Sequence, residues 1–319
     1  MLELVNFSDT AGDLEYLLSG QPHKLPTFLA QNGLDGVELM LTAPWNGTFP
    51  QQSYIKGIHL RFWPCWLDFW RDDRPRLEQT FCDDEALRRE FGCSQRKAWL
   101  EIFRQNIRAA VATGAPYFVF HVTNMRPPEL ATREFADTDQ EVMDAAADFI
   151  NLFSDEIPAD RLLLFENLWW AGLTLRNGEA ALHLLERVHH KKCGFMFDTG
   201  HMMATEMNLA NEAAGIDFLL RQLDRLGPVK QYIRGMHLHR SLTSSYVCRM
   251  LNGHRSFSTM AEALDYTLRA DQHEPFTSLR AKELVDVVQP EYLVHEFVPK
   301  DYADWCHKVQ LQRRAIGRL

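Results

Sequence analysis

Short apolar runs alternate with longer amphipathic stretches along the 319-residue chain. Most of the runs are apolar at every position rather than at every second position, which is typical of parallel strands that are covered on both faces. The pattern predicts eight strands, at Leu2–Phe7, Gly36–Leu41, Gly57–Leu60, Tyr117–Val122, Leu162–Glu166, Gly194–Asp198, Arg234–Leu238 and Tyr292–Phe297.

Amphipathic stretches between these runs predict helices at Arg96–Thr113, Asp139–Phe153, Gly178–His189, Ile216–Leu226, Leu279–Val287 and Asp301–Arg314. Strand–helix repeats over the whole length predict an α/β fold, and eight of them match a (β/α)₈ TIM barrel. A doubly wound sheet is disfavoured because the chain has no glycine-rich nucleotide-binding motif. Since no stretch resembles a linker, we expect one domain over residues 1–319.

Three connections depart from this regular repeat. Thr42–Lys56 contains Pro44, Gly47 and Pro50 and is a poor helix. Long loops are predicted at Arg61–Ser94 after the third strand and at His239–Met260 after the seventh. Both loops leave the C-terminal ends of strands, where barrel enzymes build their active sites.

Composition narrows the class of protein. The formal net charge of −9 disfavours a nucleic-acid partner, because general nucleic-acid binders carry a basic excess. The six cysteines form no CxxC pair, and no apolar run reaches the roughly 18 residues that span a bilayer. The first residues resemble no signal peptide. We therefore expect a cytoplasmic protein with no membrane partner, acting on a small molecule.

Polar residues fall at the ends of six consecutive predicted strands. A single histidine or acid at such a position is more often a structural residue or a helix cap than a ligand. Six together would be costly to bury at an apolar barrel mouth, and a divalent cation removes that cost because carboxylates and neutral imidazoles are its natural ligands. The six residues are His59, His121, Glu166, Asp198, His237 and Glu296.

The order of these motifs resembles the xylose isomerase-like barrel superfamily, which includes sugar isomerases and epimerases and DNA repair enzymes of the endonuclease IV type. The resemblance covers nearly the whole chain and rests on Phe197-Asp198-Thr199-Gly200-His201, Phe165-Glu166-Asn167, His237-Leu238-His239 and Glu296. It implies a metal cage of Glu166, Asp198, His237 and Glu296. It also implies that His201 lies next to the cage, where it would contact substrate or a second metal.

The endonuclease IV branch has further ligands for several zinc ions. His59 and His121 match its histidines on strands three and four. The nearest match to its Asp-x-His after strand seven is Asn252-Gly253-His254, with asparagine in place of aspartate. Arg240 and Ser241 stand where an aspartate usually follows the strand-seven histidine. These departures count against a complete three-metal site, although His254 stays a candidate ligand.

Candidate substrate contacts lie in the same loops. Trp63 and Trp66 follow strand three and Trp169 follows strand five, and they predict either the stacking walls of a pocket or a small hydrophobic cluster of the loop itself. Arginines in these loops could bind phosphate or carboxylate. The polar candidates for substrate binding are Asn124, Asn167, His239 and Arg240, and the further arginines are Arg61, Arg71 and Arg126.

Three functions fit this pattern. The resemblance favours a metal-dependent isomerase or epimerase of a small sugar, sugar phosphate or related polyol, because that is the larger part of the family. In it Glu166 and Glu296 would exchange a proton, with His201 as a further catalytic residue, and Mn²⁺, Mg²⁺ or Co²⁺ would stabilise an enediolate. The alternative is a Zn²⁺-dependent phosphodiesterase or other hydrolase of the endonuclease IV type, and the third is a non-catalytic binding barrel. Barrels of this family also often form homo-oligomers.

Overall fold

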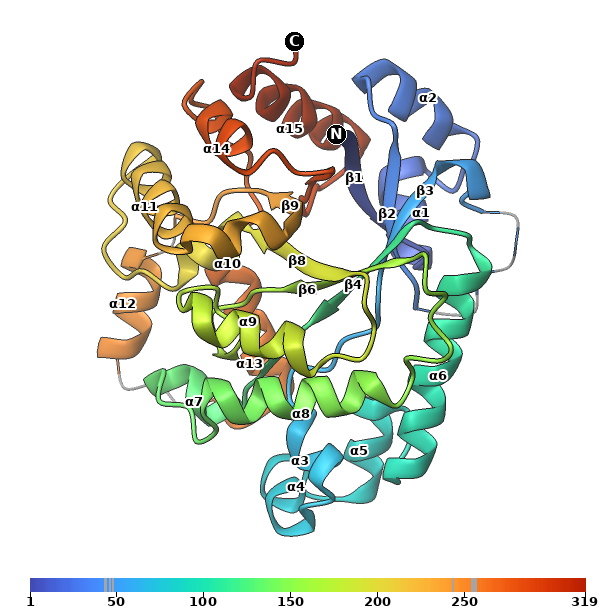
Figure 1. Cartoon of the computed structure of the whole chain (residues 1–319), viewed down its shortest axis with the longest axis vertical. Helices are drawn as coiled ribbons and strands as arrows, with labels where there is room; N and C mark the ends of the chain where they lie inside the picture. The colour runs from blue at the N-terminus through green and yellow to red at the C-terminus, as the bar shows by residue number, and fades with distance from the viewer. Residues whose placement is uncertain (43–44, 46, 48, 243, 254–256) are drawn as a thin grey trace.

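A closed barrel of eight parallel strands forms the centre of the computed structural model, which describes residues 1–319 except 43–44, 46, 48, 243 and 254–256. Its strands pair in the order β1-β10-β9-β8-β6-β4-β3-β2, so the first and last strands close the ring. The predicted (β/α)₈ barrel is confirmed (Figure 1). The strands are β1 (Leu2–Ser8), β2 (Gly36–Met40), β3 (Ile55–His59), β4 (Tyr117–His121), β6 (Leu162–Glu166), β8 (Cys193–Asp198), β9 (Ile233–Leu238) and β10 (Tyr292–His295).

The strands are apolar on both faces because each face packs against a different part of the core. Side chains such as Leu164 and Met196 point into the barrel and form an apolar layer there, while Phe165 and Phe195 point outward into the cluster that packs against the helices. Gly57 leaves room for a large interior side chain, since a Cβ at this position would lie 2.1 Å from the ring of Tyr117.

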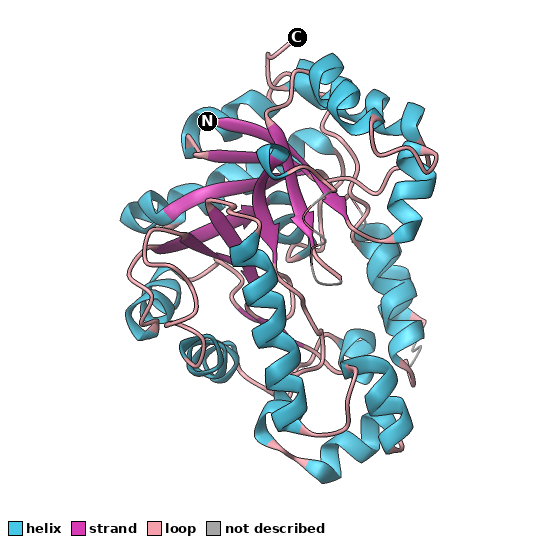
Figure 2. Cartoon of the chain, turned by 90° about the vertical axis from the view of Figure 1, so that its right-hand side faces the viewer, coloured by secondary structure: helices cyan, strands magenta, loops and turns pink. Residues whose placement is uncertain are grey.

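Helices surround the barrel, and the strands lie inside them (Figure 2). The six predicted helices are present, with ends that differ by a few residues from the predicted ones. The main outer helices are α1 (Ala11–Leu18), α2 (Lys24–Asn32), α6 (Arg96–Ala112), α8 (Asp139–Asn151), α9 (Gly178–Arg187), α11 (Glu212–Arg225), α14 (Ala281–Val288) and α15 (Tyr302–Ala315), with a 3₁₀ turn at η2 (Gly227–Tyr232).

The two long connections are present but are not irregular loops, and in this respect the prediction was wrong. Residues 61–94 contain three helices, which are too short to show an apolar period but which begin at the capping aspartates Asp73 and Asp83 or end in left-handed residues. Short helices and ladders at this end of the barrel are α3 (Leu67–Arg71), α4 (Arg74–Phe81), α5 (Asp84–Phe91), β5 (Thr123–Asn124), α7 (Pro127–Thr132), β7 (Ala171–Gly172), α10 (Thr199–Ala204), α12 (Ser244–Asn252) and α13 (Met260–Ala270).

The second strand–helix unit lacks a regular α-helix in its described part, as predicted. Between β2 and β3 the described residues form only the 3₁₀ turn η1 (Gln52–Tyr54). Across the described ranges, no helix combines the length and the apolar character that crossing a bilayer requires.

Candidate metal centre

The alternation of side chains along each strand determines where the polar residues point. Leu164 and Met196 belong to the interior layer, so Glu166 and Asp198, two residues further along, also point into the barrel at its C-terminal mouth. Both carboxylates are fully buried. The barrel interior is therefore apolar below and densely polar at the mouth.

The four residues of the predicted cage come together there. Nδ1 of His237 lies 3.3 Å from Oε1 of Glu166 and 3.1 Å from Oε2 of Glu296. The same nitrogen lies 3.7 Å from Oδ2 of Asp198. These four side chains, called the central group below, present one ligand atom each within 4.8 Å of one another.

A second group shares Glu166 with the central group. Nε2 of His59 and Nε2 of His121 lie 3.0 Å apart. They lie 3.3 and 3.1 Å from Oε2 of Glu166, which is the carboxylate oxygen that faces away from His237. Glu166 therefore presents one oxygen to the central group and the other to the pair of histidines, which we call the histidine-pair group.

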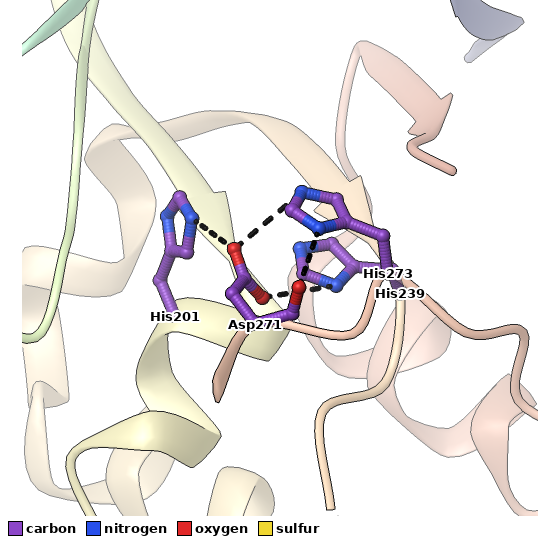
Figure 3. Close-up of side chains that lie close together, drawn as sticks. All are labelled: His201, His239, Asp271 and His273. Carbon is purple, nitrogen blue, oxygen red and sulfur yellow. Dashed lines mark hydrogen bonds and ion pairs between the residues drawn. The ribbon is translucent and has the colours of Figure 1, made fainter. Parts of the chain in front are cut away.

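A third group contains two residues that the sequence analysis missed, Asp271 and His273 (Figure 3). Oδ2 of Asp271 lies 3.0 Å from Nε2 of His201 and 3.5 Å from Nε2 of His273. His239 completes this set, with Nδ1 3.8 Å from Oδ1 of Asp271. We call His201, His239, Asp271 and His273 the outer group.

Asp271-Gln272-His273 places an Asp-x-His at the barrel mouth, and the sequence analysis did not consider it when it named Asn252-Gly253-His254 as the nearest match. The motif follows α13, and an antiparallel bridge between Arg240 and Glu274 holds it beside the end of β9. The Asp-x-His spacing can be read in the sequence. Its position at the barrel mouth could not be predicted, because the motif lies more than thirty residues after the end of β9. His254 lies outside the described residues.

Outer hydrogen bonds orient the rings. His237 donates from Nε2 to Glu38, and Glu38 accepts a second hydrogen bond from Tyr117, which makes Glu38 another residue that the sequence analysis missed. His59 and His201 each place Nδ1 within hydrogen-bond distance of a backbone carbonyl. In His237 and His59 one nitrogen is thus engaged outside the cluster and the other faces into it, as in histidines that bind metals. Nδ1 of His201 also lies 3.2 Å from Oε1 of Glu166.

Several atoms that face the cluster are buried without a hydrogen bond to any described residue. They include both carboxylate oxygens of Glu166, Oε2 of Glu296 and Nδ1 of His237 and His239. Buried polar atoms without partners are costly and uncommon in folded proteins. Oxygen and imidazole donors in this arrangement suit a divalent cation such as zinc, so the residues present fit the metal that the sequence predicts.

The electrostatics of the cluster favours ionised acids. Burial alone would raise the pKa of Glu166 and of Asp198, but the neighbouring imidazoles hold both pKa values well below their ordinary range. Burial would likewise lower the pKa of His201 and His237, yet the facing carboxylates raise both pKa values well above the ordinary range. Cations that bind here therefore compete with protons.

In each group one member is more exposed than the others. The side chains of His121, Glu296 and His273 are 12%, 15% and 14% exposed, whereas Glu166, Asp198 and His237 are fully buried. A pocket of about 250 Å³ lies beside His59 and Glu296, above the ends of β1 and β2. Ligands can thus approach the centre from one side.

The predicted aromatic residues lie around the centre in different roles. Trp63 and Trp66 are buried against Trp99, and their indole N–H groups donate to backbone carbonyls. Both tryptophans therefore belong to the main hydrophobic core, packed on α6 and α8, and not to a separate small cluster of the loop. Trp169 lies nearer to the centre, with its ring centroid 5.1 Å from that of His201.

The predicted polar contacts are held by the chain itself. Asn167 donates to the carbonyl of Asp198 and accepts from its backbone N–H, so it fixes the start of α10. Asn124 accepts from the backbone of Leu67, away from the cluster. Arg240 forms an ion pair with Glu212 at 3.3 Å. Their predicted contacts with substrate stay predictions.

Comparison with solved structures confirms the fold. Endonuclease IV from Thermus thermophilus superposes with a TM-score of 0.56 at 13% identity and full coverage of both chains. A D-tagatose 3-epimerase-like protein gives 0.55 at 15% identity, covering 99% of this chain and 97% of the other. The IOLI protein, whose structure contains a zinc atom, gives 0.51 at 15% identity, covering 99% and 97%.

Comparison of sequences identifies the family. No curated protein matches the chain. A family model described as the xylose isomerase-like TIM barrel matches residues 90–306, which is more than half of the chain. The protein therefore belongs to the xylose isomerase-like TIM barrel family, whose members include enzymes of several activities.

Proposed function

We propose that this protein is a zinc-dependent phosphoester hydrolase with three cations in its centre. The observation that carries this proposal is the outer group. Asp271 and His273 supply the ligands that the sequence analysis had failed to find, and with them three groups of candidate ligands lie at one barrel mouth. The hydrolase alternative is therefore favoured over the isomerase prediction.

The position of Glu166 also favours hydrolysis. An isomerase of the predicted type needs Glu166 and Glu296 free to exchange a proton with substrate. Glu166 is fully buried, and its two oxygens face different groups, His237 on one side and the histidine pair on the other. Glu166 would therefore be a ligand in both groups, and this role would leave neither oxygen available as a base.

The residues of the centre would have separate roles in hydrolysis. Glu166 would hold two cations at a fixed separation, and Asp198, His237 and Glu296 would complete the central group. Zinc ions bound there would supply Lewis-acid stabilisation of the phosphoester and acidify a water molecule. Because the partly exposed ligands His121 and Glu296 belong to the two groups that share Glu166, one phosphoester could contact both groups from the solvent side.

The adjoining pocket indicates a small substrate. Its polar lining includes Asn6, Ser8, Asp13 and Glu38, and no lysine or arginine is among the described residues that line it. Such a pocket does not attract a polyanion, and the net charge of −9 has the same effect. We therefore favour, as the substrate, a small phosphodiester or phosphomonoester whose other substituents are neutral or cationic. DNA is a less favoured substrate.

Metal analysis and a substrate screen test this function. The purified chain should contain close to three zinc ions and hydrolyse bis(p-nitrophenyl) phosphate or p-nitrophenyl phosphate. A duplex containing an abasic site tests the DNA alternative, and a panel of ketoses monitored by NMR exchange in D₂O tests the isomerase. One manganese-like ion together with proton exchange on a ketose would overturn the proposal.

A further inference from the structure

The outer group has four candidate ligands. Asp271 and His273 form its Asp-x-His, His201 is the third, and His239 is the fourth. Its side chain is fully buried, so water cannot satisfy its ring nitrogens. Nε2 lies 2.9 Å from Oδ2 of Asp198, whose carboxylate can only accept, so Nε2 donates. Nδ1 has no hydrogen-bond partner among the described residues and faces Asp271.

The distances suit one cation among four ligands. Two ligand atoms bound at about 2.0–2.1 Å to a tetrahedral ion lie roughly 3.3 Å apart. Oδ2 of Asp271 lies 3.0 Å from Nε2 of His201 and 3.5 Å from Nε2 of His273, and Oδ1 lies 3.8 Å from Nδ1 of His239. One ligand atom from each of the four residues lies within 4.8 Å of the others. Figure 3 shows the three rings arranged around this carboxylate.

The surrounding chain holds the ring of His239 in place. The ring stacks on that of His273, with centroids 4.2 Å apart and planes 8° from parallel. Gly200 also lies against the ring, and a Cβ there would stand 1.9 Å from Cε1 of His239. The glycine of Asp198-Thr199-Gly200-His201 is therefore needed for the ring to lie where it does.

We propose that His239 binds the cation of the outer group through Nδ1, so that this cation has four protein ligands and no open position for substrate. The inference rests on the proposed function. The histidine would also connect two groups, because its Nε2 donates to Asp198, a ligand of the central group. Substrate would then contact the two groups that share Glu166.

Zinc counts in four variants test this assignment. After dialysis against a mild chelator, wild type should retain three ions, while His239→Asn and Asp271→Asn should each retain two. The double variant should also retain two, since both changes affect one site. Asp286→Asn, which removes an acid from an exposed pair with Lys282, is the matched control and should retain three.

Two results would overturn the proposal. One is a His239→Asn protein that keeps three ions with the chelator resistance of wild type. The other is a double variant that keeps only one ion, because His239 would then act on the central group by orienting Asp198. Wild-type protein is the test of the proposed function. If it holds three ions and hydrolyses phosphoesters, either of these results contradicts only the role of His239 and leaves the proposed function intact.

A second kind of variant keeps all four ligand residues and changes only the space beside the ring of His239. Gly200→Ala should push the ring of His239 away from Asp271 and give the same loss of one ion, whereas Gly12→Ala should not, because a Cβ at Gly12 meets nothing closer than 3.8 Å. With cobalt in place of zinc, four-coordinate sites absorb strongly in the visible range. Wild type should show this band, and Gly200→Ala and His239→Asn should weaken it. An unchanged band in both variants would contradict the assignment.

Discussion

Two clusters of buried acids lie near the C-terminal ends of the strands, and they are neutralised in different ways. In the first, Arg126 donates from Nε and Nη2 to both oxygens of Asp68, each at 2.6 Å, and contacts Glu129 and Asp137 through Nη1. Asp68 and Asp137 are almost as buried as the acids of the metal centre. Every charge in this cluster has a partner from the chain.

Among the described residues, the positive partners of the acids of the metal centre are imidazoles and not arginine or lysine, and both oxygens of Glu166 are without a hydrogen bond to the described residues. An arginine of the chain supplies the positive charge in the first cluster, whereas the second is arranged for cations from outside. The comparison also explains why Arg126 is no candidate for substrate phosphate, since its guanidinium is already occupied.

The largest effect is expected from Glu166→Gln, because this carboxylate serves two groups at once. We expect the loss of up to two zinc ions per chain and a fall in kcat/KM of more than about a thousandfold, since bound metal contributes several kcal/mol to the transition state. Atomic emission and hydrolysis of bis(p-nitrophenyl) phosphate measure the two effects. Glu283→Gln, in an exposed pair with Arg280, is the matched control. Full zinc content in Glu166→Gln would exclude the bridging role.

Arg126→Met removes the positive charge that the chain itself supplies, and we expect it to lower stability without lowering zinc content. Asp68 would remain buried without its bidentate partner, and Asp137 would keep only Arg71 among its described ion-pair partners. Breaking buried pairs of this kind costs about 3–5 kcal/mol of unfolding free energy. Urea unfolding should show the loss, while zinc content stays at the wild-type level. A loss of zinc as large as that in Glu166→Gln would remove the distinction between the two clusters.

The fold could be predicted because its signals are local. Every barrel strand was placed to within about two residues, since each is a short apolar run such as Leu162–Glu166. The short helices in residues 61–94 were missed because five to eight residues give too few turns for an apolar period to appear. Their signals were caps such as Asp73 and Asp83 rather than periodicity.

The central group was predicted because its ligands stand at or just after the ends of their own strands. Asp271 and His273 stand on no barrel strand. They are held at the mouth by long-range contacts, which are the bridge between Arg240 and Glu274 and the hydrogen bonds of Ser241 with Asp271 and Gln272. Glu38 was missed for another reason. It lies inside an apolar run, and its role becomes visible only through its contact with His237, almost two hundred residues away in the chain.

A smaller effect is expected from Glu38→Gln, which acts on the metal centre through His237. The glutamine keeps an oxygen that can accept from Nε2 of His237 but loses the charge that makes the imidazole a stronger ligand. Changes of this kind typically lower metal affinity by about 10–100-fold. Competition with a chromophoric chelator measures the affinity, again with Glu283→Gln as control. An affinity equal to that of wild type would show that Glu38 only supports Tyr117.

The smallest effect is the pH dependence of the arginine cluster. Burial alone would raise the pKa of Asp137, but Arg71 and Arg126 outweigh it and lower this pKa in the folded protein. A lowered folded pKa gives stability that is fully present above the unfolded value of about 3.9 and is lost as the pH falls through the folded value. Asp137→Asn should therefore be less stable than wild type near pH 6, with a difference that shrinks below about pH 4. Urea unfolding of both metal-free proteins measures this difference in stability. Zinc is removed first because protons compete with it for the ligands of the metal centre, which would add a second pH dependence. A difference that stayed constant down to about pH 2 would mean that Asp137 stabilises the fold through its shape and not through its charge.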